Sequence, residues 1–169
     1  NWHPLGDNEN NYSIIGNQQD DPIKSLVEKI VNSIDAVLMK ESLVRNIDPK
    51  GPQAPKNMAK AQEKFFNIKD GHLSNVGLER RKELAKNISF SASGTLEEPS
   101  FAIVDKGEGQ EPDQFKETLL RLAKSAKAGV HFVQGKYGQG GSGALVFGSP
   151  KHKLQLIISK RNNEIKNKN

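Results

Sequence analysis

The sequence predicts an α+β fold in which one sheet packs against a layer of helices. Apolar residues recur at helical spacing over 22–41, whereas two short runs at 88–93 and 100–104 have the composition of strands. The predicted order is helix, helices, hairpin, helix, loop and strand, which is typical of α+β proteins. With 169 residues, the chain is long enough for one domain with a hydrophobic core.

The first predicted helix begins after Asp21, with Pro22 in its first turn, where a missing backbone N–H is tolerated. Two further helices are expected over 55–66 and 76–87, and their charged residues predict a surface insertion that spans about 46–87. The apolar residues of the first helix share one face: Ile23, Leu26, Val27, Ile30, Val31, Ile34, Val37 and Leu38.

The second half of the sequence predicts a hairpin followed by a helix, a loop and a strand. Residues 88–93 alternate apolar and small polar side chains, as a half-buried strand does. Residues 100–104 are more continuously apolar, and we expect them to form the more central strand. A helix is expected at about 112–124, a glycine-rich loop at 135–143 and a last strand at 154–159.

The composition excludes several classes of protein. The absence of cysteine excludes disulfides and thiolate metal sites. No apolar run approaches the roughly 20 residues of a membrane span, and no signal peptide is evident, so we expect a cytoplasmic protein without a membrane partner. The chain begins at Asn1 rather than Met, and we expect it to be a fragment. The histidines lack the spacing of metal ligands: His3, His72, His131 and His152.

Charge is distributed unevenly along the chain, whose net charge is +5. Residues 1–21 contain four acidic residues and no Lys or Arg, and they are expected to form an extended arm. Residues 151–169 contain six Lys or Arg and one acidic residue. A basic end of this kind can bind nucleic acid, although a solvated tail is the simpler interpretation. We therefore divide the chain into the arm, a main domain at 22–160 and a basic tail at 161–169 that marks a cut end.

Three polar residues of the first predicted helix form one candidate site. Glu28, Asn32 and Asp35 are spaced i, i+4 and i+7, so they share a stripe of the helix. A carboxylate can orient and deprotonate a water, and an amide oxygen suits Mg²⁺ that is held mostly by phosphates and water. The same spacing is also typical of solvent-facing positions on an amphipathic helix, so this segment alone leaves both interpretations open.

A second candidate segment follows the strand at 100–104. Asp105 stands where the chain leaves the sheet, and a carboxylate there can accept a hydrogen bond from an adenine amine. Gly107 and Gly109 allow the backbone to approach a ring or a phosphate. A simple glycine turn begun by Asp would have the same sequence.

The third candidate segment is the loop at 135–143, which has five glycines in nine residues. Backbone N–H groups in such a loop can bind phosphate, although a flexible linker has the same composition. The segment lacks the Gly-Lys-Ser/Thr ending of a P-loop and the context of a dinucleotide fold. Its residues are Gly135, Lys136, Tyr137, Gly138, Gln139, Gly140, Gly141, Ser142 and Gly143.

In their order and spacing, the three segments resemble the GHKL ATPase superfamily, which includes gyrase B subunits, dimeric heat-shock chaperones, histidine kinases, MutL and MORC proteins. Residues 28–36 are similar to the N-box, 105–109 to the Asp-x-Gly-x-Gly box and 135–140 to the second glycine box. Ser125-Ala-Lys127 is similar to the Ser-x-Lys of the MutL and MORC lids. The resemblance covers about 22–160. Residues 105–110 and 132–136 also resemble ATP-binding modules of large bacterial proteins.

The resemblance implies a Bergerat-type two-layer sandwich, a mixed sheet covered by helices. It implies that Glu28 is the general base, that Asn32 is the Mg²⁺ ligand and that Asp105 binds the adenine amine. It implies a lid at 110–134. The remaining ATP contacts that it implies are Asp35, Gly107, Gly109, Ser125, Lys127 and the nine residues of the glycine-rich loop, with Lys127 and Lys136 adding positive charge at the phosphates.

The function implied is an ATP-driven conformational switch, with ATP and Mg²⁺ as cofactors, ATP or ADP as the bound partner and dimerisation through the arm. Two alternatives remain open: a nucleotide-sensing module with little turnover, and a phosphotransferase of the histidine kinase type. Gly141-Ser142-Gly143 departs from the bulkier residues of the chaperones, which leaves the phosphate geometry open. The downstream domain that supplies a cation in several relatives lies outside this sequence, so we expect slow turnover by the fragment.

Overall fold

The structure is a computed structural model of the whole chain, and it describes residues 21–115, 127–135, 144, 147–148 and 154–165. Within these residues the chain forms three α-helices and one two-stranded antiparallel sheet, so the predicted α+β class is confirmed. Several predictions lie outside the described residues: the arm at 1–20, most of the helix expected at 112–124, Ser125, the loop at 136–143 and the tail at 166–169.

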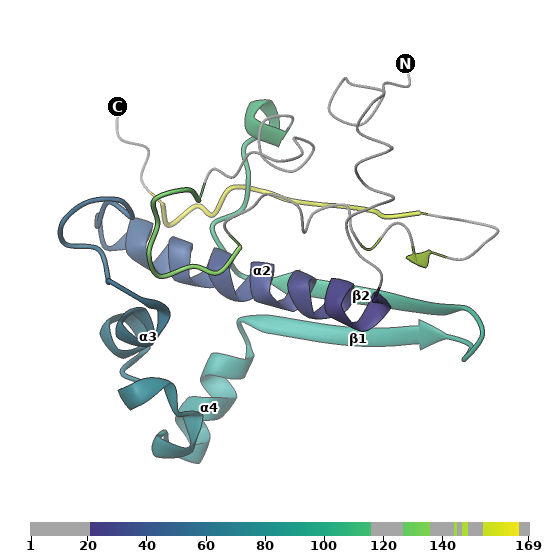
Figure 1. Cartoon of the computed structure of the whole chain (residues 1–169), viewed down its shortest axis with the longest axis horizontal. Helices are drawn as coiled ribbons and strands as arrows, with labels where there is room; N and C mark the ends of the chain where they lie inside the picture. The colour runs from purple at the N-terminus through teal and green to yellow at the C-terminus, as the bar shows by residue number, and fades with distance from the viewer. Residues whose placement is uncertain (1–20, 116–126, 136–143, 145–146, 149–153, 166–169) are drawn as a thin grey trace.

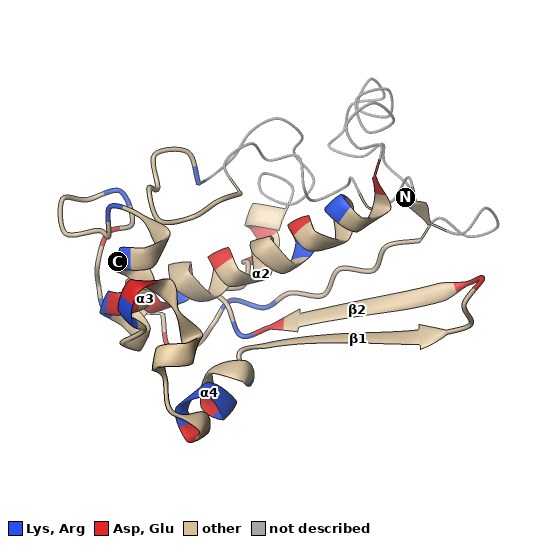
Figure 2. Cartoon of the chain, turned by 60° about the horizontal axis from the view of Figure 1, so that its bottom comes forward, with Lys and Arg blue, Asp and Glu red and all other residues tan. Residues whose placement is uncertain are grey.

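The long helix α2 extends over Pro22–Val44, and the predicted helix at 22–41 is confirmed with one additional turn. Asp21 caps its first turn, because the Asp21 carboxylate accepts hydrogen bonds from the backbone N–H of Ile23 at 2.8 Å and of Lys24 at 3.3 Å. Figures 1 and 2 both show α2 lying along the hairpin, and α2 contacts strand β2. This arrangement forms two layers.

Helix α3 covers Met58–Phe66 and helix α4 covers Leu78–Ala85, each shorter than expected from the sequence. Short 3₁₀ helices at Lys69–Gly71 and Leu73–Asn75 join them. Ala61 and Phe65 of α3 are buried, whereas α4 buries none of its residues. Within the segment, α4 is the helix that lies wholly at the surface, since α3 supplies part of the core and Ile68 and Val76 are buried.

Strand β1, at Ile88–Gly94, pairs antiparallel with strand β2, at Pro99–Asp105, which confirms the predicted hairpin. The aromatic rings of Phe90 and Phe101 stack across the pair with centroids 5.7 Å apart. The expectation that 100–104 is the more central strand is wrong for the described chain, because β2 pairs only with β1 there and most of its residues are exposed.

The strand expected at 154–159 is absent from the described structure, which assigns no regular element to 154–162. A strand requires a hydrogen-bonded neighbour, and none of the described segments pairs with this one. Leu154, Leu156 and Ile158 are all strongly exposed, so the apolar run that predicted a strand has no sheet to pack in. The helix expected from residue 112 begins as a 3₁₀ turn at Pro112–Gln114.

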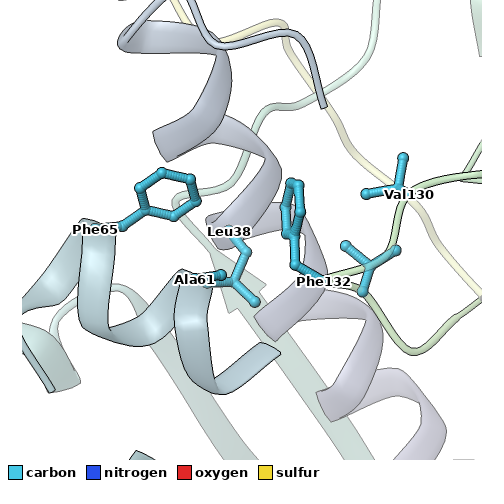
Figure 3. Packing of buried hydrophobic residues seen from close by; sticks show 6 residues of the cluster. Leu38, Ala61, Phe65, Val130 and Phe132 are labelled. Atoms are coloured by element: carbon cyan, nitrogen blue, oxygen red, sulfur yellow. The ribbon is translucent and has the colours of Figure 1, made fainter. Parts of the chain in front are cut away.

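The core joins α2, α3 and the segment 127–135. Figure 3 shows Phe65 and Phe132 on either side of Leu38, and their rings meet edge to face with centroids 6.0 Å apart. The buried residues of this cluster are Leu38, Ala61, Phe65, Val130, Phe132 and Val133. Burial of each large apolar side chain contributes about 1.5–3 kcal/mol, so the cluster fixes 130–133 against α2. None of the helices in the described part of the chain has the length and apolar character that a membrane span requires.

Candidate functional site

The loop at 105–109 packs against the middle of α2. The backbone N–H of Glu108 donates a hydrogen bond of 3.0 Å to the carbonyl of Ala36. A Cβ added at Gly107 would lie 2.5 Å from the Cβ of Ala36, closer than any real side chain can approach. Glycine at 107 is therefore required by close packing on the helix turn that carries Asp35 and Ala36.

Asp35 joins the segment 127–135 to the same turn of α2. Its side chain has no exposed surface, and its carboxylate accepts hydrogen bonds from the backbone N–H groups of Gln134 at 3.0 Å and Gly135 at 2.8 Å. The ammonium of Lys127 lies 3.3 Å from the second carboxylate oxygen. A buried carboxylate with two backbone donors and a cation is well satisfied, so Asp35 holds this segment in place.

Asn32 lies one turn before Asp35 and faces the same segment. A Cβ added at Gly135 would lie 2.7 Å from Oδ1 of Asn32 and 3.8 Å from Nζ of Lys127. A side chain at 135 would therefore displace the end of the Asn32 side chain, so glycine allows the two to approach. The structure thus brings together Asn32, Asp35, Lys127 and Gly135, which the sequence predicted as site residues from two remote segments.

Asp105 lies at the end of β2 with an exposed side chain, and its Oδ1 accepts a hydrogen bond of 2.9 Å from the backbone N–H of Gly107. This contact is the local turn that the sequence left open as an alternative. It fixes the orientation of the carboxylate at the mouth of the loop. The turn and a hydrogen-bonding role for the carboxylate are compatible, since a carboxylate has about four acceptor sites.

Glu28 lies one turn before Asn32 and is half-buried. Burial lowers the pKa of the adjacent Lys29 to about 8, although the Glu28 carboxylate favours the charged form of the lysine. In the part of the chain that the structure describes, no hydrogen bond or ion pair joins the Glu28 side chain to the loop at 105–109 or to 127–135.

Arg161 and Asn162, which were predicted to belong to the basic tail, contact the loop at 105–109. The Arg161 guanidinium lies 3.4 Å from the Glu108 carboxylate and 3.3 Å from the Gly109 carbonyl. Asn162 donates through its backbone N–H to the Glu108 carbonyl at 2.9 Å and through its side chain to the Gly107 carbonyl at 3.3 Å. These contacts hold the loop in addition to its hydrogen bond with Ala36. Nothing in the sequence distinguishes Arg161 from its basic neighbours, because the partners of both residues are mainly backbone atoms.

Four charged side chains therefore link the segments around α2: Asp35, Glu108, Lys127 and Arg161. Burial raises the pKa of the Glu108 carboxyl, and the cations of Lys127 and Arg161 oppose that effect only in part. Lys127 thus has Asp35 in direct contact and Glu108 within electrostatic range. The arrangement can present a fixed cation and glycine-lined backbone to an anion.

Ser125 and the eight residues at 136–143 lie outside the described residues, so the structure does not test their predicted contacts. Among the residues with assigned positions, no group of three or more His, Asp or Glu side chains can hold a metal ion by itself. A comparison of the chain with protein-family models, curated proteins and solved structures found no match. The functional interpretation therefore depends on the residues and geometry of the site.

Proposed function

We propose that this chain is a GHKL-type domain that binds ATP with Mg²⁺ and hydrolyses it, and so acts as a nucleotide-driven switch in a larger protein. One observation supports the proposal above the others: residues 32–36 of α2 contact both the loop at 105–109 and the segment 127–135. These are the segments that the resemblance requires to meet at one nucleotide. The two layers formed by α2 and the hairpin agree with a Bergerat-type sandwich.

The role proposed for each residue combines what the resemblance implies with the residue's position. The Asp105 carboxylate accepts a hydrogen bond from the adenine amine, while the close packing of Gly107 on Ala36 fixes the loop that carries it. The side-chain oxygen of Asn32, which lies beside Gly135, is available to a metal ion. Bound Mg²⁺ would neutralise charge on the phosphates. Lys127 supplies positive charge next to Asn32.

Calorimetric titration with MgATP tests the proposal through Asp105→Asn. The Asn amide has one acceptor oxygen for two donors, the Gly107 N–H and the adenine amine, so one charge-assisted hydrogen bond is lost. Such a loss costs about 1.5–3 kcal/mol, so we expect the affinity to fall about ten- to hundredfold. The matched control is Asp48→Asn, since Asp48 is also exposed and also accepts a hydrogen bond from a backbone N–H two residues on, but lies outside the proposed lid and site. Equal affinity of the wild type and both variants, or no binding by the wild type, would refute nucleotide binding at this site.

A binding module with little turnover is the second candidate, and one observation favours it. A general base must be oriented towards its water, and no hydrogen bond between described residues orients Glu28. Release of phosphate by wild type and Glu28→Ala separates the two functions: an ATPase loses turnover but retains ATP affinity. Equal and negligible phosphate release by both proteins, with ATP still bound, identifies the module. Dimerisation through the arm stays a prediction.

A further inference from the structure

A basic hollow lies away from the proposed nucleotide site, where the C-terminal end of α2 meets α3, α4 and the residues just after β2. Its volume is about 310 Å³. A second hollow of about 430 Å³ lies beside it and shares Phe65, Phe66 and Arg80 with it. Charged residues of both signs gather on α3 and α4 (Figure 2). More of the basic residues line the first hollow than the second, so the first is better suited to an anion.

Cations outnumber acids around the first hollow. Arg45, Arg80, Lys86 and Lys106 line it from α2, α4 and the end of β2, against the two acidic residues Glu41 and Glu83. Four positive and two negative charges leave an excess of positive charge. Such an excess in a concave site raises the local concentration of anions.

Both acidic residues are already neutralised by lysine or arginine. The Glu41 carboxylate pairs with Lys40 at 2.8 Å and also with Arg45. The Glu83 carboxylate pairs with Lys86 at 2.7 Å. Its pKa is lowered chiefly by that hydrogen bond, with further contributions from the charges of Arg80 and Lys106. Arg80 and Lys106 therefore lie close to Glu83.

Arg80 and Lys106 provide the positive charge that the acidic residues leave uncompensated. Among the described residues, neither side chain forms an ion pair with a carboxylate. The backbone N–H of Lys106 donates to the Asn87 carbonyl at 2.8 Å, which fixes the start of its side chain beside α4. An arginine fork and a lysine ammonium that converge on one hollow are suited to a phosphate group.

Arg45 is held in position before any ligand binds. Its guanidinium donates to the carbonyls of Phe65 at 3.1 Å and Glu41 at 3.0 Å, and its central carbon lies 5.3 Å from the centre of the Phe65 ring. The other neighbour of that ring is Phe132. Phe65 is also buried, with 5% of its surface exposed, so it offers no open face for stacking a base, and we take charge as the basis of recognition in the hollow.

We propose that this hollow binds a compact phosphate-bearing anion, of the size of a diphosphate group, through Arg80 and Lys106. The volume corresponds to that of about ten water molecules, which is enough for such a group and its partial hydration. The convergence of cations from three elements favours a compact ligand over the extended backbone of a nucleic acid. The site is separate from the proposed nucleotide site, although Lys106 is the neighbour of Asp105 and Gly107.

Calorimetric titration with inorganic pyrophosphate at low ionic strength tests the proposal. Arg80→Gln and Lys106→Gln should each weaken binding about tenfold or more, since each removes a charge-assisted hydrogen bond. The matched control is Arg81→Gln, because Arg81 is exposed on the same helix but does not line either hollow. It should retain the affinity within about twofold. Circular dichroism checks that all three variants remain folded.

Four results would overturn the proposal. The first is an absence of pyrophosphate binding by the wild type, and the second is an equal loss in Arg81→Gln. The third is a loss of pyrophosphate affinity in Lys127→Gln with full affinity in Arg80→Gln. That result would assign the anion to the proposed nucleotide site and would not contradict the proposed function. The fourth comes from a parallel titration with a single-stranded oligonucleotide. If it binds more tightly than pyrophosphate, and if Arg80→Gln and Arg81→Gln weaken its binding equally, the chain has a diffuse nucleic-acid surface and the proposal is wrong.

Discussion

The substitution Asp35→Asn tests whether one buried carboxylate holds the segment 127–135 against α2. An amide of the same shape retains one acceptor oxygen, but its NH₂ group must then face either a backbone N–H donor or the Lys127 ammonium. Both are donors, so at least one of the three contacts becomes repulsive. The loss of negative charge also leaves the ammonium of Lys127, which is largely buried, without its carboxylate.

Breaking a buried ion pair by changing one partner costs about 3–5 kcal/mol. In a domain of this size each kcal/mol changes the melting temperature by about 2–4 °C, so we expect Asp35→Asn to melt roughly 6–20 °C below the wild type. Calorimetry gives the midpoint. Hydrogen exchange at the amides of Gln134 and Gly135 reports whether the damage is local.

Asp48→Asn is the control, because the Asp48 carboxylate also accepts a backbone hydrogen bond, from Lys50 at 3.0 Å, but is exposed. An exposed change of this kind should alter the free energy of unfolding by about 0.5 kcal/mol or less. If the two variants melt alike, Asp35 does not stabilise the fold as argued. If Asp35→Asn melts early but the amides of Gln134 and Gly135 exchange no faster than in the wild type, the carboxylate does not hold this segment.

Two further predictions concern pH. The raised pKa of Glu108 means that the folded state favours its neutral form, so its contribution to stability should fall as pH rises above the ordinary glutamate value of 4.5. Glu108→Gln should remove that decline, and urea unfolding at acidic and neutral pH measures it; parallel pH profiles for wild type and variant would contradict the assignment. The lowered pKa of Lys29 means that the folded state favours the neutral amine, so stability should rise between about pH 8 and 10.5. At pH 7, Lys29→Met should be more stable than the wild type by at most about 3 kcal/mol. Its stability should no longer rise between about pH 8 and 10.5. A variant that is less stable than the wild type at pH 7 would show that the folded protein accommodates the Lys29 ammonium well.

The parts of the fold that depend on local sequence were predictable. Helix α2 follows from its apolar periodicity together with the Asp21–Pro22 start, because the cap and the proline act on the helix they adjoin. The hairpin follows from two short apolar runs separated by a turn. In both cases the residues that specify the element are also the residues that form it.

The parts that depend on remote partners were not predictable in the same way. Residues 154–159 have the apolar composition of a strand, but a strand also requires a neighbour that no local pattern supplies. Arg161 and Asn162 contact backbone carbonyls of the loop at 105–109. Because every residue has a backbone carbonyl, no sequence pattern marks these partners. The charged residues of α3 indicated a surface helix, yet Ala61 and Phe65 were sufficient to bring one of its faces into the core.

The difference between Asn32 and Asp35 shows why helical spacing alone assigns roles poorly. Three residues along an α-helix return to a position only about 60° from the start, so both side chains belong to one stripe and were predicted to share one ligand. In the structure, Asp35 is fully buried and its oxygens accept from three donors of the chain, whereas half-buried Asn32 directs Oδ1 towards Gly135. Asp35 is therefore suited to assemble the site and Asn32 to contact what binds there. A small rotation about the helix axis separates the two roles, because it decides which side chain the segment 127–135 covers.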